Sequence, residues 1–225
     1  MATKDIKDQA KAKKPDDMRS KAMAAYVDYY LTHGERPASV YAFCKKNKWT
    51  EDDFYKMFSS FEVLEGEVWG DIITNTVDTI QKNEAYPDYS VNEKLLAFYY
   101  TLIEVMKQNR SFILATHSNR DKHEIKPRFL KEVRKEFKAY INELIIEGLE
   151  NEEMKKRPIF SDKYDEALWI QFLFVLHFWI KDDSKDFEQT DAAIEKAVKL
   201  SSELMREGPL DSFIDMAKFI IQNAR

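Results

Sequence analysis

Glycine and proline are scarce in this chain, and this scarcity limits its possible folds more than any other feature of the sequence. Five glycines and six prolines serve 225 residues, too few for the many turns of a β-sandwich or β-barrel. Between the prolines, apolar residues recur at spacings of three and four, as on one face of an α-helix. Because 44% of the residues are hydrophobic, the chain can bury a core. The sequence therefore predicts an all-α protein.

The apolar spacing places a short first group of helices before a longer second group. In the first 60 residues we expect helices over 18–32 and 38–46, and a third that begins at Thr50. The helices expected after these span 61–81, 91–107, 111–116, 127–147, 161–180, 186–206 and 209–223. Residues 1–17 are rich in lysine and aspartate with few apolar side chains, so we expect a flexible arm there.

Charge and cysteine content exclude several classes of protein. With 35 basic and 40 acidic residues, the formal net charge is -5, so any contact with DNA has to be local. Cys44 is the one cysteine, which excludes an intrachain disulfide and fits a reducing compartment such as the cytoplasm. The most apolar run, 168–180, is shorter than the roughly 20 residues of a membrane span, and residues 1–20 lack the apolar core of a signal peptide, so we expect neither.

Motifs that carry catalysis or hold metals are missing from the sequence. It contains no glycine-rich phosphate loop, no G-x-S-x-G, no H-E-x-x-H and no pair of cysteines or histidines at metal spacing. The four histidines are scattered at positions 33, 117, 123 and 177. We therefore expect no enzymatic activity, no cofactor and no metal site.

The second and third helices are short and joined by a tight turn, as a helix-turn-helix requires. The segment carries Ser39-Val40, Phe43-Cys44, Trp49-Thr50, Phe54-Tyr55, Phe58 and then Glu62 with Leu64. Over about 45 residues and without a gap, this pattern resembles the N-terminal domain of TetR-type (TetR/AcrR) transcriptional regulators. The resemblance implies a helix-turn-helix domain over 18–60 and a helical ligand-binding and dimerisation domain over 61–225.

The same resemblance implies a homodimer that binds double-stranded DNA and responds to an apolar small molecule. Residues 168–180 are apolar nearly all round, so this helix needs a cover on every side; we expect the homodimer to form through the helices around 161–180 and 186–206. The candidate DNA-binding residues are Ser39, Tyr41, Lys45, Lys46, Lys48, Thr50, Tyr55 and Lys56. The candidate pocket residues are Trp69, Ile73, Tyr99, Ile103, Phe112, Phe137, Trp169, Phe172 and His177.

Three departures from the family pattern bear on DNA binding. Lys48 stands in the turn where the family usually has glycine, and Phe61 stands where it commonly has a lysine that contacts phosphate. Residues 51–53 are all acidic at the start of the expected recognition helix. These carboxylates would face a polyanion, although Thr50 with Asp53 also approximates a capping box, which is a purely structural role.

The C-terminal half of the sequence points to an alternative function. Residues 182–190 and the helix that follows to Met205 resemble the TetR-related lipid-binding proteins of coenzyme Q biosynthesis. From the residue types alone, the acidic run 182–190 forms a loop and the capped start of a helix. We expect this structural role rather than a binding site. The alternative function is a lipid- or isoprenoid-binding accessory protein that has lost DNA binding. His177, a polar residue in an apolar helix, would contact a ligand, or be satisfied in the core or across a dimer interface.

Overall fold

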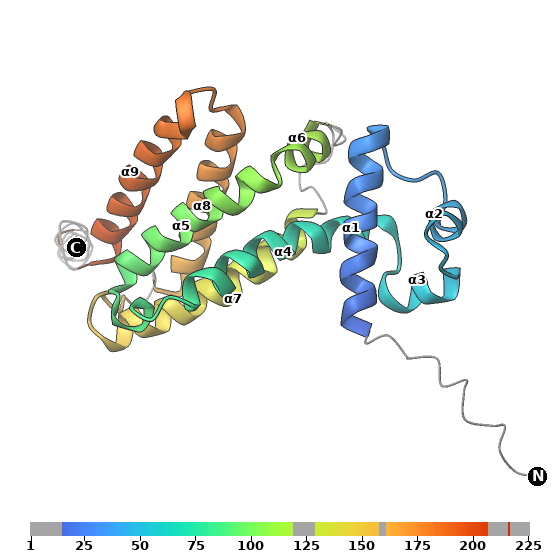
Figure 1. Ribbon diagram of the computed structural model, residues 1–225. Helices are drawn as coiled ribbons and strands as arrows, with labels where there is room; N and C mark the ends of the chain where they lie inside the picture. Colours follow the sequence, from blue (N-terminus) through green and yellow to red (C-terminus); the bar gives the residue numbers. More distant parts are fainter. Residues whose placement is uncertain (1–14, 119–128, 158–160, 207–215, 217–225) are drawn as a thin grey trace, which may run out of the picture. The chain divides into compact units, whose positions relative to one another are not determined.

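The structure is a computed structural model, and it describes residues 15–118, 129–157, 161–206 and 216. Over these residues it consists of α-helices and short 3-10 turns with no β-strand (Figure 1). The predicted all-α class is confirmed. The chain forms two compact units: unit 1 comprises Met1–Val68 and Ser111–Phe129, and unit 2 comprises Trp69–Arg110 and Leu130–Arg225.

Unit 1 contains the helix-turn-helix. Its helices are α1 (Pro15–His33), α2 (Val40–Asn47), α3 (Glu51–Met57), the first part of α4 (Phe61–Gln81) and α6 (Arg110–Ser118). Of α6, only Arg110 belongs to unit 2. Helix α1 ends where the backbone turns left-handed at Gly34, with φ of 75°, because glycine adopts this conformation without a steric penalty. Helices α2 and α3 contact each other across a turn of three residues.

Aromatic side chains fill the core of unit 1. The rings of Phe43 and Phe54 are 6.3 Å apart and edge-on, and both are buried. Helix α6 belongs to this unit because Phe112 packs edge-on against Tyr26 and Tyr30, with ring centroids 6.4 and 5.9 Å apart. Such contacts fix the angles between short helices that have little stability of their own.

Unit 2 is a bundle of longer helices: the second part of α4, α5 (Val91–Gln108), α7 (Phe129–Glu150) beyond its first residue, α8 (Tyr164–Lys181) and α9 (Glu188–Met205). The 3-10 turns η1 (Tyr86–Asp88), η2 (Ser161–Lys163) and η3 (Lys185–Phe187) precede α5, α8 and α9. Helix α4 lies close to α7, since a β-carbon at Gly70 would come within 3.4 Å of Glu132 Cβ.

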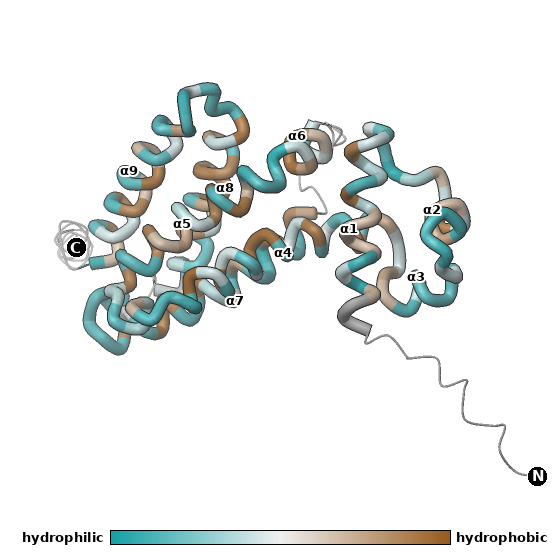
Figure 2. The backbone as a smooth tube through the Cα atoms, viewed as in Figure 1, coloured by the Kyte–Doolittle hydropathy of each residue, from teal (hydrophilic) through white to brown (hydrophobic). Residues whose placement is uncertain are grey.

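Helices α8 and α9 pack side by side, and α9 also contacts α5. Hydrophobic and hydrophilic stretches alternate along α9 (Figure 2), the pattern of a helix with one buried face. Asp182 ties the two helices together, because its carboxylate accepts hydrogen bonds from the backbone and hydroxyl of Thr190 in the first turn of α9, at 2.8 and 2.5 Å.

The helices lie close to their predicted positions, and the differences are local. Helix α1 begins at Pro15 rather than Met18, and the expected arm otherwise lies outside the described residues. Of the helix expected at 209–223, Met216 alone is described, and it is helical. The division between the units falls after Val68 rather than at residue 60. The start of α4 groups with unit 1 because its side chains pack on α1 and α2, which the spacing of apolar residues does not reveal.

Candidate functional site

The helix-turn-helix is fixed by caps at the start of both short helices. The Ser39 hydroxyl accepts a hydrogen bond from the Ala42 amide at 3.1 Å at the start of α2. At the start of α3, the Thr50 hydroxyl accepts from the Asp53 amide and the Asp53 carboxylate accepts from the Thr50 amide, each at 3.1 Å. This reciprocal pair is the predicted capping box, and it confirms the structural role of Asp53.

The backbone of Lys48, in the turn between α2 and α3, adopts a conformation that glycine adopts more readily than other residues. Its φ of 60° and ψ of 38° are left-handed, and its amide bonds to carbonyls of the last turn of α2. A residue with a β-carbon pays about 1 kcal/mol or more for this geometry. The turn therefore keeps the geometry that the family pattern implies, at the cost of local strain, and it places the Lys48 side chain in solvent.

All eight candidate DNA-binding residues are exposed on α2, the turn and α3. The side chains of Tyr41 and Tyr55 are 58% and 54% exposed, unusual values for aromatic residues of a packed unit. The ammonium of Lys45 lies 5.7 Å from the Tyr41 ring, and that of Lys46 lies 5.0 Å from the Tyr29 ring. The short helices thus present aromatic and basic side chains on their outer surface.

The acidic residues of α3 differ in what they contact. Hydrogen bonds from the hydroxyl and amide of Thr50 lower the pKa of Asp53. Asp52 pairs with Lys56 one turn later, at 2.5 Å, and this bond raises the pKa of Lys56. Glu51 is exposed. One of the candidate phosphate contacts, Lys56, is therefore already engaged by a carboxylate of its own helix.

Phe61 belongs to the aromatic core rather than to the DNA surface. Its ring lies 5.8 Å from Tyr26, 5.5 Å from Phe43 and 5.3 Å from Phe54. The position that carries a phosphate-contacting lysine in the family pattern thus joins α4 to α1, α2 and α3 here. From the sequence one sees the loss of a charge at this position; only the packing shows what replaces it.

A buried carboxylate lies behind the same helices, and sequence reasoning missed it. Glu65 on α4 is 5% exposed, and it accepts hydrogen bonds from the Tyr26 hydroxyl at 2.6 Å and the Arg36 Nε at 3.0 Å. Burial and this carboxylate raise the pKa of Tyr26. Arg36 also bonds to Glu62 at 2.7 Å. The cluster links α1 and the loop after it to the first turns of α4.

Of the candidate pocket residues, four aromatic ones meet in the core of unit 2. The Phe137 ring lies 5.7 Å from Trp169 and 4.8 Å from Phe172, and Phe98 connects it to Tyr99. Burial raises the pKa of Tyr99. Trp69, Ile73 and Ile103 are buried as well. These side chains form a closely packed core, and their role as ligand contacts stays a prediction.

The remaining two candidates lie elsewhere. Phe112 packs in unit 1, and His177 is exposed on α8. Since successive residues of a helix are 100° apart, His177 shares the outer stripe of α8 with Ile170 and Phe174, which lie seven and three residues before it. The inward stripe is formed by the buried Phe172, Val175, Leu176 and Trp179.

This outer stripe borders an apolar groove of about 890 Å³ between α8 and α9. Ile170 and Phe174 are 67% and 50% exposed on α8, and Leu200 and Leu204 are 57% and 47% exposed on α9. Small side chains of α9, among them Ala193 and Ala197, also line the groove. So many exposed apolar side chains on one face are typical of an interaction site.

A metal site, a membrane span and a reactive thiol would each bear on function. Among the described residues, no group of His, Cys, Asp and Glu side chains is placed to hold a metal ion. No described helix is both long and apolar enough to cross a membrane. Cys44 is buried, and burial raises the pKa of its thiol, so its reactivity is low.

The sequence and fold resemble those of known proteins. The family model described as "Tetracyclin repressor-like, C-terminal domain" matches residues 94–220, more than half of the chain. A crystal structure from Shewanella sp. PV-4, of a protein assigned to the TetR family of transcription regulators, superposes with a TM-score of 0.55 at 12% identity. The match covers 84% of this chain and 98% of that one. No curated protein matches the chain in sequence.

Proposed function

Because the chain belongs to the TetR family of tetracyclin repressor-like proteins, we propose that it is a cytoplasmic transcriptional regulator that binds double-stranded DNA as a homodimer. The helix-turn-helix of unit 1 carries this proposal: both short helices are capped, and every candidate contact is exposed. In proteins of this class the second short helix enters the major groove while flanking side chains grip phosphates. Here α3 is that helix.

The lysines of α2 and the turn supply the charge for phosphate contacts. Lys45, Lys46 and Lys48 are exposed and close together in sequence, whereas Lys56 is paired with Asp52. We therefore assign the main electrostatic role to α2 and the turn rather than to α3. Tyr41 and Tyr55 add exposed hydroxyls that can donate to phosphate oxygens.

The second copy of the chain is the proposed cover of the groove between α8 and α9. A two-fold axis along this face would bring the same apolar stripe from each protomer together, as a symmetric interface requires. It would also bury His177 beside apolar neighbours on its stripe, where a partner group can bond to it. Replacing Phe174 by Glu should give a monomer in analytical ultracentrifugation, and a sedimentation coefficient equal to that of the wild type would contradict this interface.

The aromatic core of unit 2 is the proposed place for an apolar ligand. There the Phe137 ring contacts those of Trp169 and Phe172, and Phe98 connects Phe137 to Tyr99. A ligand would have to separate these rings, and movement of the core would reach α4, which runs from unit 2 into unit 1. Such a shift changes the spacing of the two recognition helices, which is how ligand and DNA binding become coupled.

The DNA surface is tested by charge reversal in a salt series. Purified protein is mixed with duplex fragments that include the DNA flanking its own gene, and retention is measured from low to physiological salt. We expect selective retention that weakens steeply with salt, because phosphate contacts release counterions. The double variant Lys46→Glu with Lys48→Glu should abolish retention while its helical content and oligomeric state stay unchanged.

A matched control changes the net charge equally but in the other unit of the chain. Lys82→Glu with Lys131→Glu replaces two exposed lysines of unit 2 and should keep most of the retention. Equal loss in both double variants would mean that net charge alone matters, and unchanged retention in the first would show that α2 and the turn do not contact DNA.

A lipid- or isoprenoid-binding accessory role is the second candidate, favoured by two observations. Phe61 has no charge to offer to phosphate, and Glu51 faces solvent where DNA would lie. The apolar groove between α8 and α9 is large enough for a lipid chain. If the wild type retains no duplex even at low salt, native mass spectrometry of copurified apolar molecules tests this second role.

A further inference from the structure

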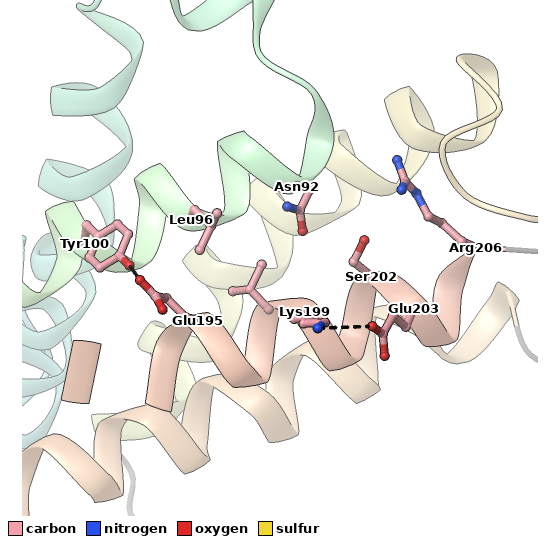
Figure 3. A pocket seen from close by; sticks show the side chains of 9 residues that line it. Asn92, Leu96, Tyr100, Glu195, Lys199, Ser202, Glu203 and Arg206 are labelled. Carbon is pink, nitrogen blue, oxygen red and sulfur yellow. Dashed lines mark hydrogen bonds and ion pairs between the residues drawn. The ribbon is translucent and has the colours of Figure 1, made fainter. Parts of the chain in front are cut away.

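A hollow of about 380 Å³ between α5 and α9 has a balanced charge. Lys199 and Arg206 line it together with Glu195 and Glu203 (Figure 3), so its charges select neither an anion nor a cation. The charged side chains of unit 1 are arranged differently, because two arginines there connect carboxylates of α4 to the helix-turn-helix.

Arg19, near the start of α1, contacts both α3 and α4. Its Nη1 donates a hydrogen bond to the carbonyl oxygen of Met57, the last residue of α3, at 3.2 Å, and its Nη2 pairs with the carboxylate of Glu67 on α4. The guanidinium carbon lies 4.8 Å from the centre of the Phe58 ring, directly after α3. Because the last carbonyls of a helix have no partner within the helix and carry partial negative charge, a guanidinium is well suited to this position.

Arg36 makes a similar connection at the other end of the helix-turn-helix. It lies in the loop between α1 and α2, three residues before the Ser39 cap. Its Nε and Nη2 bond to the two carboxylate oxygens of Glu65, at 3.0 and 3.2 Å, and its Nη1 bonds to Glu62 at 2.7 Å. A planar guanidinium that is bound at several nitrogens has a fixed orientation as well as a fixed position. Carboxylates of α4 therefore hold the entry to α2 through Arg36 and the end of α3 through Arg19.

Helix α3 depends on such contacts for its orientation. It has seven residues, too few to be stable in isolation, and side chains that read base edges have to be held within about 0.5 Å and 10–20° of their productive geometry. The aromatic core fixes the buried face of α3, where Phe54 packs against Phe43 and Phe61. Arg19 fixes the C-terminal end of the same helix against α4.

We propose that Arg19 is a positioning residue for DNA binding, which fixes the recognition helix α3 on Glu67 of α4 without contacting DNA itself. This inference rests on the proposed function of unit 1. The positive charge of Arg19 is paired with Glu67, so it is compensated within the protein and adds little to the attraction of phosphates. Breaking this bridge from either side therefore weakens DNA binding by misplacing α3, whichever of the two charges is removed.

The test compares two variants that change the net charge in opposite directions. Arg19→Met removes a positive charge and keeps an apolar side chain against Phe58, whereas Glu67→Gln removes a negative charge. Both should weaken the retention of duplex DNA about tenfold, because each loses a hydrogen bond to a charged group. Retention should fall with salt as steeply as in the wild type, since the number of phosphate contacts is unchanged. The melting temperature should change little, because the pair is partly exposed and such pairs contribute little to stability.

The matched control is Glu35→Gln, at an exposed residue of unit 1. It changes the net charge as Glu67→Gln does, and it should retain DNA at least as well as the wild type. If Glu67→Gln binds DNA as tightly as this control, the proposal is overturned. A shallower salt dependence in Arg19→Met would also overturn it, because it would show that Arg19 contacts phosphate directly.

Hydrogen exchange tests the bridge without DNA. The Phe58 amide donates to the Phe54 carbonyl at 2.8 Å at the end of α3. This amide should exchange faster in both variants than in the wild type, and wild-type exchange rates in both would overturn the proposal. If the wild type retains no duplex DNA, the proposed function fails, whereas faster exchange in the variants still supports the bridge between α3 and α4.

Discussion

The carboxylate of Asp182 is the contact whose removal should most clearly affect the pairing of α8 with α9. It lies at the end of α8, is 6% exposed, and accepts four hydrogen bonds. Two come from the amide and hydroxyl of Ser184, at 2.9 and 2.6 Å, and two from those of Thr190. These bonds hold its pKa at about 2, below the ordinary 3.8, because they stabilise the charged form.

The size of the effect follows from this difference in pKa. A lowering from 3.8 to about 2 corresponds to about 2 kcal/mol of stability at neutral pH. Asp182→Asn keeps one acceptor but loses the charge, so at pH 7 we expect it to lower the free energy of unfolding by about 2 kcal/mol and the melting temperature by roughly 4–8 °C.

The sign of the pH dependence follows from the same bonds. Because the pKa is lower in the folded protein, the stabilisation is complete well above pH 3.8 and disappears as the pH falls through about 2. Urea denaturation of wild type and Asp182→Asn should therefore show a difference at pH 3 about half of that at pH 7. A difference independent of pH would refute the reasoning. Asp183→Asn, at the exposed neighbouring residue, is the control and should change little at either pH.

Three other variants test parts of unit 1 and unit 2. Lys48→Gly should raise the free energy of unfolding by about 1 kcal/mol in thermal denaturation, because it relieves a left-handed backbone; a loss of stability would contradict the strain. Glu65→Gln should lower it by about 2 kcal/mol in urea, since the donors of Tyr26 and Arg36 lose a charged acceptor. Arg157 donates to the backbone carbonyls of Leu204 and Arg206 at the end of α9. Arg157→Met should therefore lower the free energy of unfolding by a similar amount and increase hydrogen exchange at the end of α9; unchanged exchange would show that Arg157 does not hold this end of the helix.

The candidate DNA surface was largely predictable because it depends on local sequence. Caps such as Ser39 and Thr50 act on the amides of their own next turn, so the order of residues alone reveals them. Exposure of the eight candidate residues followed from the helix-turn-helix register. What the sequence could not show was which charges are engaged, because the pairing of Asp52 with Lys56 competes with other rotamers of both side chains on an exposed surface.

The interior of unit 2 was less predictable. An apolar helix over 168–180 implied a cover on every side, but not which stripe its own unit would leave open. The structure exposes Ile170 and Phe174, places His177 on the same stripe, and moves Phe112 into unit 1. Each of these outcomes depends on contacts between helices distant in sequence, which periodicity does not specify.

The sequence by itself determined the elements of this protein: helices, their approximate ends, the capped helix-turn-helix and the family pattern. These depend on interactions within a few residues of each other, where spacing and residue type are sufficient. The tertiary structure alone decided that Phe61 completes an aromatic core, that Glu65 is buried among donors, and that Arg19 joins the end of α3 to Glu67 of α4. Such features arise from close packing between distant segments, and the free energy of packing depends on shape that no linear pattern encodes.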